Sequence, residues 1–286
     1  MNLPSLFVSH GSPMIALEPG EAGAFLARLG PSIDATFGRP RAVLAISAHT
    51  TARAPALLAA ARHGTVHDFG GFPDALYALR YDAPGAPALA AEVQSLLERA
   101  GIAATRFDKG GLDHGIWTVL RFLYPDADVP VLPLALVPDL SPQGQFALGE
   151  ALAELRGRGV LVLGSGSITH NLSLVFSNRP RVGEPLHRAD TTASDEMPES
   201  RAFRDWMADR SSARDWDALF DYRHQAPHAA LMHPTDEHLL PWYPAAGAGG
   251  RDATPIRLYE NVTLGCLGMD TYAFGDGATA LQAALH

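Results

Sequence analysis

Three histidines stand just after apolar runs of the sequence. His10 ends "LFVSH", His49 ends "AVLAISAH", and His170 follows "GVLVLGSGSIT". The runs predict strands buried on both faces, because such strands are almost continuously apolar. The predicted strands cover residues 6–9, 42–47 and 160–164. Parallel strands end at one edge of an open sheet, where ligands bind, and imidazole is the commonest transition-metal ligand. Any one of these histidines alone fits an ordinary packed side chain, but the three together predict a Zn or Fe site.

A further ligand is expected from "MHPTDEHLLPWYP". On a helix, His233 and His238 would lie ~140° apart and could not both face one metal. We favour His238, because apolar residues follow and anchor it. Glu237 is the fallback, since two histidines and one carboxylate form the usual Fe(II) oxygenase site. The alternative is a capped surface helix with Thr235 as its N-cap.

A fifth histidine, His114, stands in "LDHGIW", in a glycine-flanked loop before a predicted helix. Its imidazole could hydrogen-bond an anionic substrate or intermediate. The alternative is that Asp113 caps the helix and His114 only packs.

A glycine- and aromatic-rich stretch, "HDFGGFPDALYALRY", contains Gly70 and Gly71 beside several aromatic rings. Such a loop can lie over a flat ligand. A turn with packed aromatic side chains is the simpler interpretation.

Composition excludes several classes of protein. The chain has 286 residues and a net charge of −9, and its 22 Lys and Arg residues are scattered, which argues against nucleic-acid binding. No run approaches the ~20 apolar residues of a membrane span, so no membrane association is expected. The single cysteine, Cys266, rules out an intrachain disulfide and favours a cytoplasmic location. "GSGSIT" lacks the third glycine of a dinucleotide-binding loop.

Apolar runs alternate with amphipathic segments along the chain, which predicts an α/β fold with a mainly parallel central sheet flanked by helices. A further strand is predicted over residues 129–136, and helices over 87–100 and from Pro142 onward, capped by Ser141. Residues 254–275 predict two antiparallel strands at the C-terminal end. Residues 178–200 are polar and interrupted by prolines, which predicts a surface excursion. We expect a single catalytic domain over residues 1–286.

Eight segments occur in an order that resembles the extradiol ring-cleaving dioxygenases. They are "SHGSPM", "SAHT", "HDFGGFPDALY", "YDAPGAPALA", "LDHGIWTVL", "YPDADVPVLPLAL", "GSGSITHNL" and "PTDEHLLP". The chain most resembles the 4,5-DOPA dioxygenase branch, which is related to the catalytic subunit of protocatechuate 4,5-dioxygenase. The similarity runs from about residue 5 to the C-terminal strands.

The resemblance implies roles for the histidines. His10 and His49 become metal ligands, with His238 as a further ligand where the related subunit has a glutamate. His170 is implied at the metal, as a fourth ligand or as the acid/base. His114 is implied near the substrate. Residues 178–200 are the least family-like stretch, and His233 receives no role.

The resemblance also implies a reaction. A non-haem Fe(II) enzyme would open the ring of a small aromatic diol, such as a DOPA-like catechol, with O2. His170 would shuttle protons and His114 would stabilise charge that develops on oxygen. Zn(II) is possible in the same site, but it cannot pass electrons to O2. The alternative is therefore a zinc-binding protein of the same fold, acting as a hydrolase or as a non-catalytic interaction protein.

Overall fold

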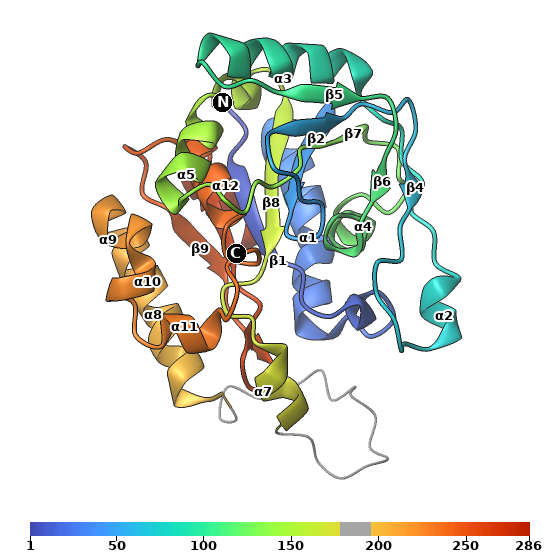
Figure 1. The fold of residues 1–286 in the computed structure, drawn as a ribbon. Coiled ribbons are helices and arrows are strands. Elements are labelled where there is room, and N and C mark those ends of the chain that lie inside the picture. Colours follow the sequence, from blue (N-terminus) through green and yellow to red (C-terminus); the bar gives the residue numbers. More distant parts are fainter. Residues whose placement is uncertain (178–195) are drawn as a thin grey trace.

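A six-stranded sheet forms the centre of the computed structural model, which describes residues 1–177 and 196–286 (Figure 1). Four neighbouring strands run parallel, whereas β12 runs antiparallel to both β1 and β9. This topology confirms the predicted α/β fold with a mainly parallel sheet and antiparallel C-terminal strands. From one edge to the other, the strands are β7 (Val131–Pro133), β2 (Ala42–Ser47), β8 (Val160–Gly166), β1 (Ser5–Ser9), β12 (Thr271–Phe274) and β9 (Ile256–Tyr259).

The strands that precede the histidines lie side by side in the middle of the sheet. In the parallel register, Ser47 of β2 pairs with Ser165 of β8, and Ser9 of β1 pairs with Gly166 of β8. The carboxyl ends of these three strands therefore reach the same edge. The predicted ends of the first two strands are confirmed, and β8 continues two residues beyond the predicted end.

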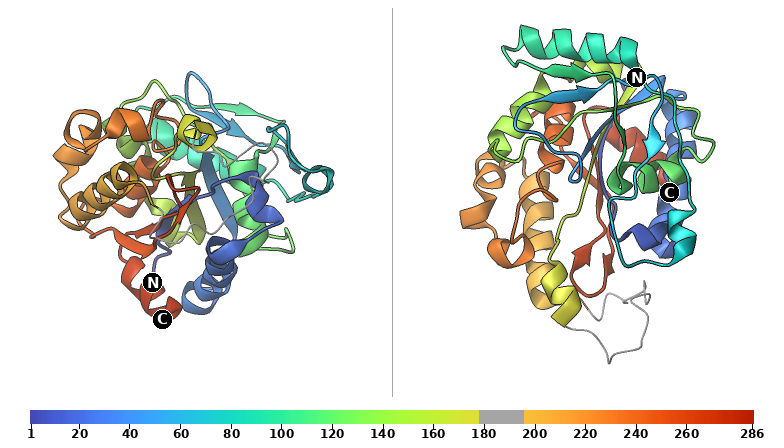
Figure 2. Two further views of the ribbon diagram at one scale, coloured as in Figure 1. Left: turned by 90° about the horizontal axis from the view of Figure 1, so that it is seen from below. Right: turned by 45° about the vertical axis from the view of Figure 1, so that its right-hand side comes forward.

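Both faces of the sheet are buried, which explains the continuous apolar runs. Along β2, Val43 and Ala45 belong to one core cluster, and Leu44 and Ile46 belong to the other. Side chains of a strand alternate between its two faces, so both sets must be apolar. Helices α1 (Gly20–Phe37), α4 (His114–Leu123) and α13 (Ala278–Leu285) cover the first face (Figures 1 and 2). Helices α3 (Pro87–Arg99), α5 (Pro142–Glu150), α8 (Pro198–Ser212) and α12 (Trp242–Gly249) cover the second.

Local signals in the sequence account for the helix ends. The Ser141 hydroxyl caps α5 by accepting the Gly144 amide hydrogen bond at 3.1 Å. After α3 the chain turns at Gly101, whose φ is 76°.

The prediction of antiparallel strands at the C-terminal end is also confirmed, because β9 and β12 pair antiparallel. A small hairpin of β10 (Val262–Thr263) and β11 (Leu267–Gly268) lies between them.

Two predictions need correction. The strand predicted over residues 129–136 is only three residues long, because Pro130 and Pro133 have no N–H for a ladder. Beyond it, Leu134 and Leu136 make isolated bridges. Of the surface excursion predicted over 178–200, residues 178–195 lie outside the described residues, and 198–200 begin α8 with a buried Ser200.

Short elements complete the described chain, and none of its helices is long and apolar enough to cross a membrane. These elements are a 3-10 helix (Pro13–Ala16), β3 (Ala56–Leu58), β4 (Gly64–Thr65), β5 (Thr105–Phe107), β6 (Gly111–Leu112), α2 (Asp74–Tyr77), α6 (Glu154–Gly157), α7 (Leu172–Ser177), α9 (Trp216–Phe220), α10 (Tyr222–Gln225) and α11 (Ala229–Met232).

Candidate active site

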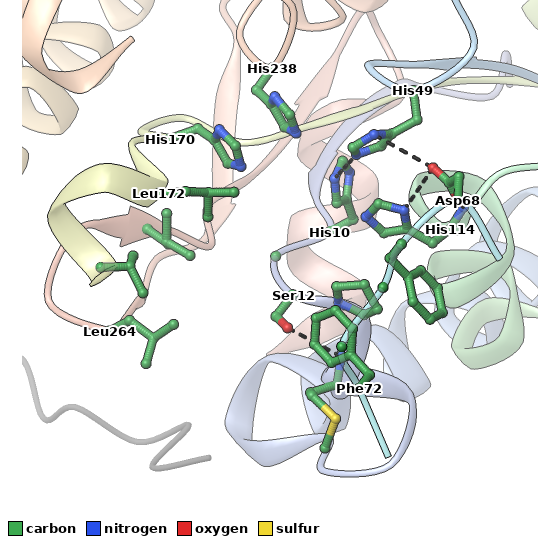
Figure 3. Close-up of a pocket in the computed structure, with 18 of the residues that line it drawn as sticks. His10, Ser12, His49, Asp68, Phe72, His114, His170, Leu172, His238 and Leu264 are labelled. Atoms are coloured by element: carbon green, nitrogen blue, oxygen red, sulfur yellow. Dashed lines mark hydrogen bonds and ion pairs between the residues drawn. The ribbon is translucent and has the colours of Figure 1, made fainter. Parts of the chain in front are cut away.

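A pocket of about 530 Å³ opens at the carboxyl edge of the sheet (Figure 3). All five histidines that the sequence singles out for a role line it: His10, His49, His114, His170 and His238. They come from segments far apart in the chain. The common edge of the parallel strands brings His10, His49 and His170 together, whereas His114 comes from the start of α4 and His238 from a turn.

Two glycines allow the backbone to present the rings. Gly11 has a φ of 62°, in the left-handed region, and turns the chain away directly after His10. Gly166 lies against the backbone of His238, where an added Cβ would stand 2.0 Å from the His238 carbonyl oxygen. The next amide, that of Ser167, donates to the same carbonyl at 2.8 Å. The end of β8 thereby fixes the position of His238.

Three of the rings form a cluster that can hold a metal ion. One ring nitrogen from each of His10, His49 and His238 lies within 4.8 Å of the others. The Nε2 atoms of His10 and His49 are 3.1 Å apart. A metal lies ~2.0–2.2 Å from an imidazole nitrogen, so this separation corresponds to a ligand–metal–ligand angle of about 90–100°. Such an angle suits adjacent ligands of one ion.

A buried serine fixes which nitrogen of His10 faces the cluster. The Ser165 hydroxyl donates to the Gly115 carbonyl at 2.5 Å. A hydroxyl has one hydrogen, so Ser165 can only accept from His10 Nδ1, which lies 3.0 Å away. The hydrogen of His10 is therefore on Nδ1, and Nε2 offers its lone pair to the cluster.

Carboxylates favour the same tautomer in His49 and His238. Asp68 Oδ2 lies 3.6 Å from His49 Nδ1, and Glu237 Oε1 lies 3.2 Å from His238 Nδ1. A carboxylate accepts and does not donate, so it favours a hydrogen on the facing nitrogen. Metal-binding histidines commonly have such partners, which orient the ring and fix its tautomer. Glu237, predicted as a fallback ligand, thus lies beside His238.

Burial keeps the imidazoles of His10, His49 and His170 neutral. Burial, followed by the neighbouring histidines, lowers the pKa of His10 well below its usual value and that of His49 to about 3. Burial and then His238 lower the pKa of His170 to about 2. The hydrogen bond from His238 is the main reason that the pKa of Glu237 falls to about 2. Metal binding requires neutral imidazole and ionised carboxylate, so the site is prepared for a cation.

His170 has a different relation to the cluster. Its ring stacks on that of His238, with 3.5 Å between centroids and 7° between planes. An ion bound by an imidazole lies close to the ring plane, along the nitrogen lone pair. Two nearly parallel planes this far apart do not meet near the rings, which disfavours an ion in the plane of both, although one nitrogen of each ring and a Glu237 oxygen lie within 4.8 Å of one another.

The predicted Asp113 cap is present, and His114 lines the pocket. Asp113 is the N-cap of α4 and accepts from the Ile116 amide at 3.2 Å. His114 begins the helix and lines the pocket. Asp68 accepts from its backbone amide at 2.9 Å and from its Nδ1 at 3.0 Å. Nε2 is therefore the free ring nitrogen of His114.

The two histidines of "HPTDEH" have different surroundings. His238 lines the pocket, whereas His233 is fully buried elsewhere, with its Nε2 2.7 Å from the Ile168 carbonyl oxygen. Residues 234–241 form bends and turns rather than a helix, so the alternative of a capped surface helix is wrong. Thr235 donates to the Glu237 side chain instead.

The glycine- and aromatic-rich loop combines both of its interpretations as well. Phe69, Gly70, Gly71 and Phe72 line the pocket. Tyr81 of the same stretch is buried and donates to a backbone carbonyl at 2.9 Å. One part of the loop faces the pocket and the other part packs.

Sequence reasoning missed Asp68 and Ser165. Asp68 stands next to His67 in "HDFGGFP", where a carboxylate followed by a glycine-rich turn was a usable signal. Ser165 lies in β8 and looks like any small strand residue. Only the register with β1 shows that its hydroxyl meets His10.

Comparison with known proteins shows the family of this chain. A model of the family described as the catalytic LigB subunit of aromatic ring-opening dioxygenase matches residues 4–272. 4,5-DOPA dioxygenase extradiol of Beta vulgaris is 34% identical over 273 residues, which cover 94% of this chain and 96% of the relative. The Escherichia coli (strain K12) protein of the same name is 33% identical over 278 residues, which cover 96% and 95%. The crystal structure of an uncharacterized protein from Escherichia coli K12 has a TM-score of 0.73 and 27% identity, covering 96% of this chain and 100% of that one.

The fold and these similarities define the class of the protein, an extradiol aromatic ring-opening dioxygenase and hence an oxidoreductase. The chain belongs to the family of the catalytic LigB subunit of aromatic ring-opening dioxygenases. Enzymes of this family are metal-dependent, and the histidine cluster is the candidate place for the metal.

Proposed function

We propose that this enzyme is a non-haem Fe(II)-dependent dioxygenase that opens the ring of a catechol with O2, and that His10, His49 and His238 hold the iron. The convergence of three imidazole nitrogens within 4.8 Å carries the proposal. His10 and His238 have a hydrogen-bond acceptor at their other ring nitrogen, as metal-binding histidines commonly do, and Asp68 lies 3.6 Å from that of His49. Three protein ligands leave positions for the substrates. Relatives named 4,5-DOPA dioxygenase extradiol make a DOPA-like catechol the first substrate to test.

Bound in this cluster, Fe(II) would hold the catechol oxygens beside O2 and allow electrons to pass between them. The remaining chemistry belongs to the protein. His170 is neutral and lines the pocket, so it can take a proton from a catechol hydroxyl. The negative charge of the ionising substrate beside it favours that transfer. Its stacking on His238 favours this role over that of a fourth ligand.

His114 is proposed to hold a substrate oxygen. Asp68 engages its Nδ1, so Nε2 faces the pocket and can hydrogen-bond the substrate. Phe69 and Phe72 provide the apolar surface on which an aromatic ring can lie. Both atoms of O2 enter the product, as a carboxylate and a carbonyl at the opened ring bond, so no further reductant is needed.

The competing proposal is a zinc site, because histidines bind Zn(II) more tightly than Fe(II). Zn(II) does not change its oxidation state, so zinc-loaded protein would be inert toward catechols or would act as a hydrolase. Protein should be prepared anaerobically, analysed for metal, stripped, and reloaded with either ion. We expect Fe(II) alone to restore catechol-dependent oxygen uptake. Equal uptake with Zn(II) would rule out electron transfer through the metal.

We also propose that residues 1–286 act as one catalytic domain. The N-terminal strand β1 pairs with β12 near the C-terminus, and the family match spans nearly the whole chain. Limited proteolysis should then give no stable fragment that lacks either end of the sheet. A fragment that retains metal and activity without β12 would contradict a single domain.

A further inference from the structure

One wall of the pocket is apolar and has no part in holding a metal. Figure 3 shows Leu172 and Leu264 on the side of the pocket below His170, across the opening from Phe72. Val175, Phe176 and Leu267 line the pocket as well. We name these five residues the apolar wall: Leu172, Val175, Phe176, Leu264 and Leu267.

The apolar wall is built from two segments that lock together. Val175 of α7 packs in one buried cluster with Cys266 and Leu267, which belong to the hairpin. The Thr169 hydroxyl, just before α7, accepts from the Gly268 amide at 2.8 Å. The wall is therefore joined to the loop that carries His170, and its distance from the histidines is fixed.

Leu172, a member of the wall that lines the pocket, is 45% exposed, a high value for a leucine. Leu264 stands at the hairpin tip with a φ of 53°, in the left-handed region that Asn and Gly adopt most readily. A leucine there costs free energy of folding. Strained residues of this kind gather at ligand sites, where the contact they make outweighs the strain.

The charged residues of the pocket also favour an apolar ligand at the wall. Among the described lining residues there is no Lys or Arg, and Asp68 is the only carboxylate. Its oxygens are already engaged by His114 and face His49. A carboxylate on the substrate would lose water at the apolar wall and gain no cation from these residues, which is unfavourable.

We propose that the apolar wall binds the substituent of the catechol ring, and that the preferred substrates carry an uncharged apolar chain, such as an alkyl group, rather than a carboxylate or an amino acid. The proposal rests on the function proposed above for the histidine cluster. It separates this enzyme from its relatives named 4,5-DOPA dioxygenase extradiol, because DOPA carries both a carboxylate and an ammonium group.

The test compares catechols that differ only in the substituent. With Fe(II)-loaded enzyme, kcat/KM should rise by about two- to fourfold per methylene from 4-methylcatechol to 4-butylcatechol. It should be at least about tenfold higher for the methyl ester of 3-(3,4-dihydroxyphenyl)propanoate than for the free acid. DOPA should rank with the acid. Equal values for acid and ester, or no dependence on chain length, would overturn the proposal.

Binding without turnover keeps the two proposals apart. Zinc-loaded protein, titrated calorimetrically with 4-butylcatechol and with the free acid, should show the same preference. If 4-butylcatechol binds more tightly than the free acid but no catechol supports oxygen uptake with Fe(II), the proposed reaction is wrong and the proposal for the apolar wall is retained. If uptake occurs and the acid binds as well as 4-butylcatechol, the apolar-wall proposal fails alone.

Variants at Leu172 should change the preference between substrates. Misfolding would lower kcat/KM for all substrates alike. Leu172→Gln should lower kcat/KM for 4-butylcatechol by about fivefold or more and alter that for unsubstituted catechol less. Leu172→Arg should lower the ratio of kcat/KM for the methyl ester to kcat/KM for the free acid by at least about tenfold, because it supplies a cation for the carboxylate. The matched controls are Leu231→Gln and Leu231→Arg, on a 38% exposed leucine of α11 that does not line the pocket. An unchanged ratio in Leu172→Arg would count against the wall as the substituent site.

Discussion

The histidine cluster and the apolar wall face each other across one pocket, yet they are built differently. His10 and His238 are 2% and 6% exposed, and each has a hydrogen-bond partner on the ring nitrogen that points away from the cluster. The wall takes its side chains from a short helix and a hairpin tip. There Leu172 is 45% exposed, and Leu264 has a left-handed backbone.

This difference separates the two tasks of the pocket. Chemistry at a metal needs ligands held within a few tenths of an ångström, and the ends of buried parallel strands provide that rigidity. Contacts with a substituent tolerate looser geometry and are made by surface segments, which can change without disturbing the sheet. Substitutions in the histidine cluster should therefore abolish metal binding or turnover, and those in the wall should shift substrate preference.

The largest effect is expected from removing a proposed ligand. In His10→Ala or His49→Ala, bound metal and oxygen uptake should both fall to background, because only two cluster nitrogens remain. Metal analysis and oxygen electrode measurements on the same preparation give both quantities. His224→Ala is the control, since the His224 side chain is 84% exposed and lies outside the pocket lining. Full metal content in both cluster variants would mean that the ion binds elsewhere.

His170 stands between the two regions and should respond differently. Gln reaches about as far and can hydrogen-bond, but it cannot exchange a proton near neutral pH. In His170→Gln we expect metal content to survive and turnover to drop by about 10²–10⁴-fold, the usual contribution of a general acid/base. His233→Gln is the internal control and should change neither quantity. Loss of metal in step with activity in His170→Gln would instead identify a ligand.

The histidine cluster was largely predictable from the sequence, for a topological reason. An apolar run followed by His fixes both the burial of the strand and the edge at which it ends. His10, His49 and His170 therefore converge without any knowledge of the loops. His238 required a choice against His233, guided by the apolar residues that follow His238 and by the family resemblance. The structure supplies the cause, which is the contact of its backbone with Gly166.

The partners of the rings and the apolar wall were not predictable in the same way. Ser165 touches His10 only because β1 and β8 pair in one particular register, and a register is a long-range property. The apolar wall joins α7 to a hairpin about 90 residues later in the chain, with no shared pattern. The strand predicted over residues 129–136 is shorter in the structure because Pro130 and Pro133 lack the N–H that a ladder needs.

An intermediate effect should come from the partner of a ligand. Ser165→Ala removes the acceptor for His10 Nδ1, so the ring can adopt the other tautomer. We expect metal affinity, measured by competition with a chelator, to fall by ~10–100-fold. Ser167→Ala is the matched control, since Ser167 is equally buried just after β8, but its hydroxyl lies within hydrogen-bond distance of the backbone carbonyls of residues 169 and 268 and not of a ring. Both variants should lose ~1–3 kcal/mol of stability after metal removal. Equal metal affinities would show that the serine does not orient the ring.

The smallest effect concerns the free energy of unfolding, and it tests whether the apolar wall gives up stability for a ligand contact. Leu264→Asn loses the burial of a half-covered side chain, about 1 kcal/mol, but relieves about as much left-handed strain, because Asn tolerates that conformation. The net change in denaturant unfolding should stay within about 0.5 kcal/mol, with metal content unchanged. Leu267→Asn is the comparison in the same hairpin, since Leu267 is 2% exposed in an extended strand and has no strain to relieve. There we expect a loss of ~2–4 kcal/mol, because a buried leucine is replaced by an amide without a partner. If Leu264→Asn destabilised the protein as much as Leu267→Asn, then Leu264 would be an ordinary core residue and the strain at the hairpin tip would carry no information about a ligand.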